Sequence, residues 1–384
     1  MGAVDLDSLD DHAFRMEVRK FVEANYPEEL RFSSVRLGWR ETSMWHDKLY
    51  ERGWAAPGWP KEYGGLGLSP YRQVIIQEEF ARFGVSRAPD PGINMLGPLL
   101  IRYGTEEQKK EFLPRTLSGE IVWAQGYSEP GSGSDLASLR TEAVPDGEDF
   151  VVNGQKIWTT FAHEADWIFM LVRTSKEGKP QQGISFLLVD KSTPGIEVRP
   201  IINLTMHHEF NEVFFDDVRV PRKNMVGELN KGWTIAKSLL GFERLTLGSP
   251  MMATDPLFRL RALAEARGVF DDPAFADKYT RLRMDVEDLA ATYARFMEVV
   301  RAGGELGPDA SILKLWVSEV YQAITDLLLE VAGEDSAAAQ DTVVGNSSMH
   351  VANIFFTARP RTIAGGTSEV QRNVIAKYVL GLPG

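Results

Sequence analysis

Residues 149–161 read DFVVNGQKIWTTF, and residues 166–174 read DWIFMLVRT. Both stretches are short and rich in Val, Ile, Phe and Trp, a composition that is typical of β-strands. The Asn-Gly pair inside the first stretch is a turn signal that commonly joins two antiparallel strands. These residues therefore predict a sheet in the middle of the chain.

Similar short segments extend the predicted sheet region from about residue 121 to residue 228. PDGE at residues 145–148 is a second turn signal within it. No helical segment intervenes that would carry a parallel crossover, so we expect antiparallel strands in a closed or sandwiched sheet.

Helical periodicity flanks the sheet region on both sides. Residues 10–27, DDHAFRMEVRKFVEANYP, place apolar residues at helical spacing and end at a proline. Thr105 with Gln108 forms a capping-box signal for a further helix, and the helical segments after the sheet region are long. The sequence therefore predicts an α–β–α order, with domains at residues 1–120, 121–228 and 229–384.

The composition excludes several classes of function. With 42 basic and 54 acidic residues, the net charge of -12 argues against nucleic-acid binding. The absence of cysteine excludes disulfides, thiolate metal sites and cysteine nucleophiles. The six histidines are scattered and show no HExxH spacing, so no metal site is expected. The N-terminus is acidic, unlike a signal peptide, and the apolar runs are far shorter than the ~18 residues of a membrane span. We therefore expect a cytoplasmic protein without a membrane span.

Two stretches in the sheet region are candidate binding segments, YSEPGSGSD at residues 127–135 and WTT at residues 158–160. Free N–H groups of the Gly-Ser stretch are suited to a phosphate or a flavin edge, and an indole can lie against an aromatic ring. The alternatives are a plain loop between strands and a tryptophan of the core. The spacing of a Rossmann fingerprint is absent.

Glu243 lies in SLLGFERL, where Ala236, Leu240 and Leu247 share its helix face by their spacing. A carboxylate on an apolar stripe is costly unless it is paired or neutral. Its pKa is then raised toward neutrality, as a general base requires. The alternative is an ion pair with a neighbouring basic group such as Arg244.

Near the end of the chain, residues 361–373 read RTIAGGTSEVQRN, with two glycines directly before the start of a helix. Ser368 and Gln371 fit a capping box at this start. The glycines serve either a tight turn or the close approach of a ligand to the backbone.

Seven motifs, in order over nearly the whole chain, resemble those of the acyl-CoA dehydrogenase family. They are WPKEYGGLGLS, YGTEEQKKEFLP, YSEPGSGSDLASLRT, VVNGQKIWTT, FNEVFFDDVRVP, GFERL and GGTSEVQRNVIAKYVLGLP. The resemblance implies an α+β multidomain fold, with an N-terminal helical domain, a middle antiparallel β-barrel and a C-terminal four-helix bundle. It also implies FAD between the barrel and the bundle.

Carried over motif by motif, the resemblance assigns the cofactor contacts. They are Gln125, Tyr127, Ser128, Gly133, Ser134, Trp158, Thr160, Arg267, Phe270, Gly366, Thr367 and Glu369. Ser134 and Arg244 are also expected to contact the substrate. Arg267 and Phe270 would meet the FAD of a neighbouring subunit.

The family removes an α-proton from an acyl-CoA thioester while the β-hydride passes to flavin N5, which gives the trans-2-enoyl-CoA. One branch, which includes isovaleryl and long-chain enzymes, supplies the base from a bundle helix in a sequence like LER. This resemblance implies that Glu243 is the base. Gly365 would contribute only a backbone N–H to the thioester oxygen.

The resemblance further implies a bacterial-type enzyme of lipid β-oxidation that passes electrons to an electron-transferring flavoprotein. We expect a homotetramer, or a heterotetramer with a related subunit. Two departures from the family pattern concern the inter-subunit part of the FAD site: Asp271 follows ARGVF where glycine is usual, and LEVAGED lacks the expected Gly-Gly. The alternatives are a non-catalytic or co-catalytic subunit, and an acyl-CoA oxidase or flavin monooxygenase of the same fold. The acyl group is left open.

Overall fold

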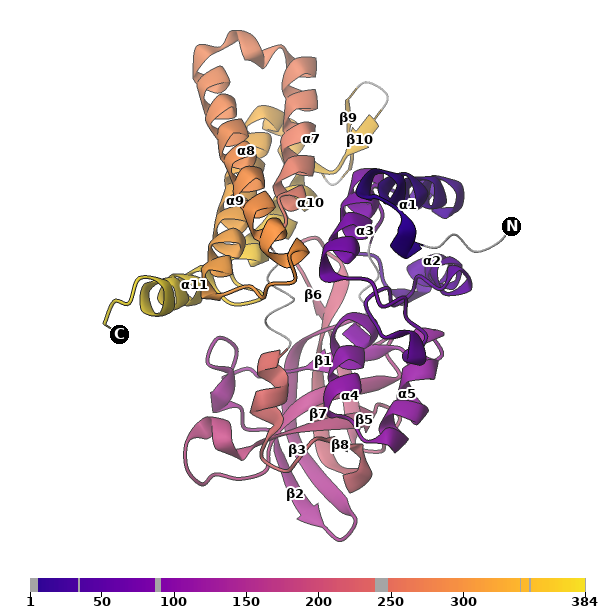
Figure 1. Ribbon diagram of the computed structural model, residues 1–384. Coiled ribbons are helices and arrows are strands. Elements are labelled where there is room, and N and C mark those ends of the chain that lie inside the picture. Colours follow the sequence, from indigo (N-terminus) through magenta and orange to yellow (C-terminus); the bar gives the residue numbers. More distant parts are fainter. Residues whose placement is uncertain are drawn as a thin grey trace. The chain divides into compact units, whose positions relative to one another are not determined.

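A computed structural model of the protein describes residues 6–33, 35–86, 91–238, 248–338, 340–344 and 347–383. The chain forms two compact units, Met1–Leu240 and Gly241–Gly384, which we describe one at a time. The first unit holds the N-terminal helices and the large sheet, and the second holds the C-terminal helices (Figure 1). The three domain bounds expected from the sequence stay predictions.

The helices that precede the sheet begin and end where local rules place them. Asp10 accepts a hydrogen bond from the Ala13 N–H at the start of the first helix, and Gly84 ends the third with a φ of +77°. The predicted capping box is confirmed, because Thr105 and Gln108 each bind the other's backbone N–H. The helices are α1 (Asp11–Asn25), α2 (Trp39–Arg52), α3 (Pro70–Phe83), α4 (Gly97–Tyr103) and α5 (Glu106–Leu117).

An eight-stranded sheet has the hydrogen-bonded order β6-β7-β3-β2-β4-β5-β8, with β1 paired to β4. The expected closure into a barrel is wrong for the described strands, because β6 and β8 are free edges and β8 has only two residues. The sheet domain itself is confirmed. Its strands are β1 (Trp123–Gly126), β2 (Glu142–Asp146), β3 (Asp149–Thr160), β4 (Trp167–Arg173), β5 (Ile184–Asp190), β6 (Ile196–Ile202), β7 (His208–Pro221) and β8 (Met225–Val226).

Two details of the sheet differ from the sequence expectations. Strand β1 runs parallel to β4, because β2 and β3 form the crossover between them in place of a helix. Asn153 and Gly154 lie inside β3 rather than in a turn, where Gly154 has a φ of +149° at a register shift against β7. At this shift one residue of β3, Asn153, lies opposite two of β7, Asp216 and Asp217, so the β-bulge is on β7. The PDGE turn is confirmed, since it joins β2 to β3.

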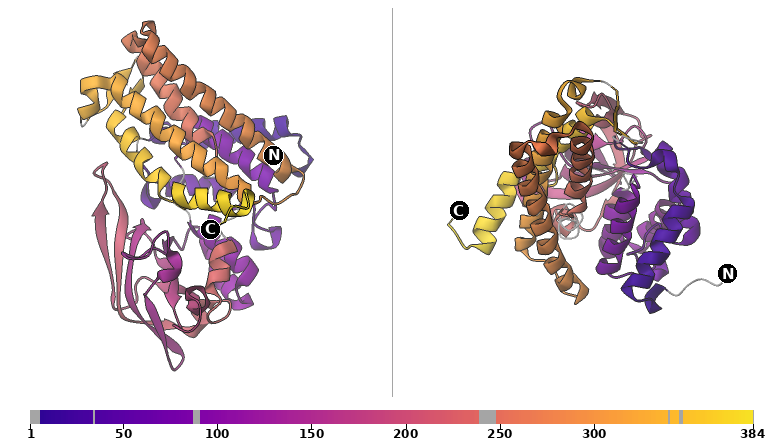
Figure 2. Two further views of the ribbon diagram at one scale, coloured as in Figure 1. Left: turned by 90° about the vertical axis from the view of Figure 1, so that its left-hand side faces the viewer. Right: turned by 90° about the horizontal axis from the view of Figure 1, so that it is seen from above.

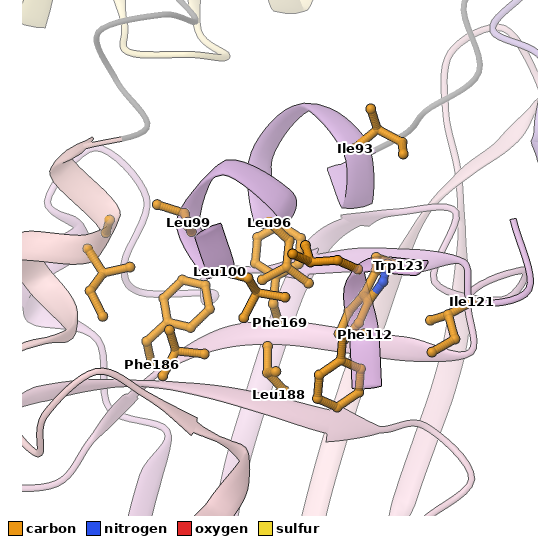
Figure 3. Packing of buried hydrophobic residues seen from close by; sticks show 14 of the residues in the cluster. Ile93, Leu96, Leu99, Leu100, Phe112, Ile121, Trp123, Phe169, Phe186 and Leu188 are labelled. Carbon is orange, nitrogen blue, oxygen red and sulfur yellow. The ribbon is translucent and has the colours of Figure 1, made fainter. Parts of the chain in front are cut away.

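Strands β4 and β5 are buried on both faces, which explains their nearly continuous apolar runs. On one face, Phe169, Phe186 and Leu188 pack against residues of α4 and α5 (Figure 3). On the other face, Ile168 and Leu187 join a second cluster with residues of β3 and β7. Strands β4 and β5, packed on both faces, thereby support the ends of β1 and β3.

Helix α9 is the centre of the second unit. Helices α7, α8, α10 and α11 all contact it, and Figures 1 and 2 show α7, α8 and α9 side by side. Buried residues lie on most of its circumference, as burial among several neighbours requires. The expected C-terminal helical bundle is therefore confirmed. Its elements are α7 (Met251–Arg267), α8 (Pro273–Arg301), α9 (Ser311–Ala332), β9 (Thr342–Val344), β10 (Ser347–Met349), α10 (Val351–Ala358) and α11 (Ser368–Val374).

Within the described ranges, no helix combines the length and the hydropathy that are needed to cross a bilayer.

Candidate functional site

The loop of residues 127–135 leaves β1 and lies against β3. Backbone hydrogen bonds between Glu129 and Ser132 run in both directions, at 2.8 and 3.0 Å. The Ile157 N–H donates to the Ser128 carbonyl oxygen at 2.9 Å, which joins the loop to β3. A Cβ added to Gly133 would meet nothing within 4 Å. The backbone of this loop is therefore open to a ligand on its outer side.

Trp158 occupies a bulge near the end of β3. Its φ of +60° is a strained conformation for a bulky side chain, and the register against β7 shifts between Lys156 and Thr159. The indole is 57% exposed and meets the Phe210 ring edge-on. The alternative of a core tryptophan is therefore wrong, because a strained backbone holds this ring outside the core.

The structure brings the predicted binding residues of the first unit close together. Strand β1 contacts β3, and the loop that follows β1 is bonded to Ile157 of β3. The residues placed there are Gln125 in β1, Tyr127, Ser128, Gly133 and Ser134 in the loop, and Trp158 and Thr160 in β3. Their contacts with a cofactor or a substrate stay predictions.

In the second unit, Gly365 and Gly366 form a turn before α11 with φ values of +67° and +91°. Lys314 Nζ donates to the Gly366 carbonyl oxygen at 2.6 Å, and Gln371 Nε2 lies 3.4 Å from the Gly365 carbonyl oxygen. No hydrogen bond among the described residues uses the N–H of either glycine. The turn is thus held through its carbonyl groups, and its N–H groups stay available.

The predicted capping box of Ser368 and Gln371 is wrong. Thr367 caps helix α11 instead, since its hydroxyl accepts from the Val370 N–H at 3.1 Å. The side chain of Gln371 turns to the glycine carbonyl groups. Glu369 lies in the first turn of α11, where a negative charge is favoured. Hydrogen bonds from the backbone N–H of Glu369 and from the Thr367 hydroxyl lower the pKa of the Glu369 carboxyl.

Arg267 and Phe270 are engaged within their own unit. Arg267 forms an ion pair with Asp335, and Phe270 packs edge-on against Phe275 and Tyr279. The role of Arg267 and Phe270 toward a neighbour's cofactor stays a prediction.

Glu243 and Arg244 lie outside the described residues, with the whole of 239–247. The helix that leads into this segment covers residues 232–238, and its Ala236 is 5% exposed. The assignments of Glu243 as a base and of Arg244 as a substrate contact stay predictions.

The residues present fit a planar aromatic cofactor with polar edges. In the first unit, Trp158 offers an exposed ring, and the buried hydroxyl of Thr159 has no hydrogen-bond partner in the described part of the chain. In the second unit, considered by itself, the buried hydroxyl of Ser368 has no such partner either. Buried polar atoms are usually paired, so a bound group with donors or acceptors would satisfy them. In the same part of the chain, no cluster of His, Asp or Glu is arranged to hold a metal ion.

A cavity of about 490 Å³ lies beside the exit of the 127–135 loop, between Ala137 and Glu142 and the β4–β5 connection. Its lining includes the basic side chains of Arg140, Arg173, Lys176 and Lys179. Arg173 donates to backbone carbonyl groups of this region, and Lys176 pairs with Glu142. Among the described residues, neither Arg140 nor Lys179 takes part in an ion pair. The carboxylates of Glu142 and Glu177 also line the cavity, but the basic side chains outnumber them, so the cavity is suited to an anion.

Sequence reasoning missed two buried lysines. Lys156 of β3 is 0% exposed and Lys314 of α9 is 4% exposed, and burial lowers the pKa of each. A signal was present for Lys314, which stands among apolar residues in SILKLWV. A signal was present for Lys156 as well, because alternation along β3 places it on the same face as the buried Phe150 and Val152.

Three family models match the chain in sequence order. They are the acyl-CoA dehydrogenase N-terminal domain at residues 8–120, the middle domain at residues 124–218 and the C-terminal domain at residues 230–380. A relative from Mycobacterium tuberculosis, acyl-CoA dehydrogenase IpdE1, is 38% identical over 389 residues, which cover 97% of this chain and 98% of the relative.

Two solved structures share the fold. The structure titled Tcur3481-Tcur3483 steroid ACAD has a TM-score of 0.85 and 32% identity, and covers 99% of this chain and 100% of that chain. The ChsE4-ChsE5 complex from Mycobacterium tuberculosis has a TM-score of 0.81 and 33% identity, and covers 98% of this chain and 99% of that chain.

The geometry of the glycine turn predicts the effect of Gly366→Ala. A Cβ at this φ of +91° would lie 2.6 Å from Gln371 Nε2, so the backbone is strained and the clamp on the turn is displaced. We expect a loss of about 1–3 kcal/mol in the free energy of unfolding, with faster amide hydrogen exchange over residues 365–371.

Gly381→Ala is the matched control, because Gly381 has a φ of +65° and an added Cβ would meet nothing within 4 Å. It should cost stability without changing exchange over residues 365–371. Equal amide exchange over residues 365–371 in both variants would contradict the role of Gln371 in holding the glycine turn.

Proposed function

Because the chain belongs to the acyl-CoA dehydrogenase family, whose members are flavin-dependent oxidoreductases, we propose that it oxidises an acyl-CoA thioester to the trans-2-enoyl-CoA. The Gly365–Gly366 turn carries this proposal. It bears no side-chain carboxylate, its carbonyl groups are held by Lys314 and Gln371, and its N–H groups stay available. Such donors stabilise a thioester oxygen on which negative charge develops.

Glu243 is the base that takes the α-proton in this proposal. The support is its place in GFERL, where the sequence spacing predicts an apolar helix face, and an unpaired carboxylate in such a place would have a raised pKa. With glycine at position 365, a second segment has to supply the carboxylate. The Gly365 N–H then holds the thioester oxygen while the α-proton leaves.

FAD, when bound, supplies the acceptor for the β-hydride. The residues that would hold it in the first unit are those of the 127–135 loop with Trp158 and Thr160, and in the second unit Gly366, Thr367 and Glu369. The support is the exposed indole and the unpaired hydroxyls of Thr159 and Ser368. Arg267 and Phe270 would complete the site of a neighbouring subunit.

The proposed assembly is a tetramer, the form typical of the family, built from one chain or with a related subunit. A mixed assembly is supported by the relatives titled as the ChsE4-ChsE5 complex. The ion pair of Arg267 with Asp335 also supports it, because it engages the arginine within its own unit. Such a partner subunit would have to complete the cofactor site.

The proposed acyl group is bulky, and the proposed electron acceptor is an electron-transferring flavoprotein. The support for the bulky group is the likeness to the structure titled a steroid ACAD, together with a base supplied from the bundle helix. A panel of CoA thioesters assayed with an artificial electron acceptor identifies the acyl group. Stopped-flow reoxidation in air separates a dehydrogenase from an oxidase or a monooxygenase. The cytoplasmic location stays a prediction.

The substitution Glu243→Gln tests the base. The amide keeps the shape of the carboxylate but does not accept a proton at neutral pH, so kcat should fall by ~10²–10⁴ with a substrate that the panel confirms. FAD content, measured from the visible spectrum, should be unchanged, because the transferred proton plays no part in cofactor binding. A variant that turns over at close to the wild-type rate would place the base elsewhere.

The basic cavity predicts where the nucleotide end of CoA binds. Arg140→Ala and Lys179→Ala should each raise KM for the CoA thioester by about 5-fold, since an exposed ionic contact is worth about 1 kcal/mol. KM for the same acyl group on a shorter pantetheine thioester, which lacks the phosphorylated nucleotide, should not change. Lys110→Ala, which removes an exposed charge from α5, is the control. An equal rise in KM with both thioesters would contradict this placement.

A further inference from the structure

A buried ion pair lies beneath the 127–135 loop, and the proposed chemistry gives it no task. Lys156 is 0% exposed, and its Nζ donates to Glu129 Oε1 at 2.8 Å and to the Tyr127 carbonyl oxygen at 3.2 Å. An ammonium group that is buried loses its hydration, and a well-packed apolar side chain would often serve stability as well.

Glu129 extends the contacts of Lys156 to the far end of the loop. This carboxylate is 8% exposed and accepts from the Arg140 N–H at 2.6 Å and from the Thr141 N–H at 2.9 Å. Lys156 thus binds the first residue of the loop, Tyr127, and Glu129 binds Arg140 and Thr141, which follow the loop in sequence. The two charged side chains together hold both ends of the loop from its buried side.

The outer side of the same loop is the side left open. Gly133 and Ser134 are exposed, and a Cβ on Gly131 or on Gly133 would meet nothing within 4 Å. A loop with two glycines loses much conformational entropy when it is ordered. If an internal contact orders the loop in advance, a ligand does not have to bear that cost on binding.

We propose that the Lys156–Glu129 ion pair is a positioning device that preorganises the 127–135 loop for the flavin, so that Lys156 sets cofactor affinity without touching the cofactor. This inference rests on the proposed function, because it takes the flavin to bind at this loop.

The proposal has a pH signature. Burial lowers the pKa of Lys156 to about 8, against the opposing effect of Glu129, and Arg173 of β4 adds to the lowering. Burial alone would raise the pKa of Glu129, but Lys156 and the loop hydrogen bonds lower it overall. These are the charged groups that face Lys156. As the pH rises through about 8, Lys156 loses its proton and the loop loses the Lys156–Glu129 ion pair.

Affinity for the flavin should therefore be strong below this pKa and weaker above it. The contribution of Lys156 to global stability has the opposite sign. Its folded-state pKa of about 8 lies below the ordinary lysine value of 10.5, so the unfolded chain binds more protons between these values, and this contribution rises with pH there. If Lys156 only stabilised the fold, affinity for FAD would not fall over the pH range in which the contribution of Lys156 to stability rises.

The test measures the dissociation constant of FAD by flavin fluorescence, at about pH 7 and about pH 9.5, on either side of the Lys156 pKa of about 8. The wild-type protein should bind about tenfold more weakly at the higher pH. Lys156→Met should bind about tenfold more weakly at the lower pH and show no further change. Lys156→Arg, which stays charged at both values, should show a flat profile with affinity above that of the methionine variant.

Glu79→Gln is the control for a buried ion pair away from the loop. Glu79 is 4% exposed and pairs with Arg19 and Arg82, each at 3.0 Å. This variant should melt at a lower temperature and keep the wild-type dissociation constant.

The inference is overturned if the wild-type constant is the same at both values of pH, a result that needs no variant to fold. It is also overturned if Lys156→Met binds FAD as the wild-type protein does. Wild-type protein that binds no FAD at either pH overturns the proposed function as well, which separates the two failures.

Discussion

In the first unit, a charge pair that is buried beneath a glycine-containing loop joins this loop to β3. Strands β4 and β5, packed on both faces, give β1 and β3 a firm base. Lys156 projects from β3 and Glu129 from the loop after β1, and their contact ties the two segments together. The strained, exposed Trp158 follows two residues later on the same strand. Because Lys156 and Trp158 lie on the same strand, the contact between Lys156 and the loop also sets the position of the indole relative to the loop.

The second unit also has a buried lysine that donates to a backbone carbonyl oxygen, although no ion pair accompanies it among the described residues. Lys314, buried in the central helix α9, binds the carbonyl oxygen of Gly366, as Lys156 binds that of Tyr127. In both places a buried ammonium group donates a hydrogen bond to a carbonyl oxygen of a segment that contains glycines. Amide N–H groups are then left for a ligand, which suits a cofactor with polar edges and a thioester oxygen that becomes negative.

Much of the fold and part of the site could be predicted from the sequence. Helix periodicity, the Thr105–Gln108 capping box and the PDGE turn follow local rules, and these predictions are confirmed. The open sheet, the bulge of β3 at Trp158 and the cap at Thr367 depend on which segments pack together, which a local pattern does not contain. The tasks of Lys156 and Lys314 depend on contacts with segments distant in sequence. Helical spacing singled out Glu243 but left an ion pair open, and its assignment as the base came from the resemblance and stays a prediction.

In the proposed function, this chain removes hydrogen from an acyl-CoA thioester. The most direct measurement mixes the purified, FAD-loaded protein with a panel of CoA thioesters in the absence of oxygen and follows the flavin absorbance. The account predicts that at least one bulky thioester bleaches the flavin, with formation of one enoyl-CoA for each flavin reduced. Flavin that stays oxidised with every thioester, while dithionite still reduces it, would contradict the account.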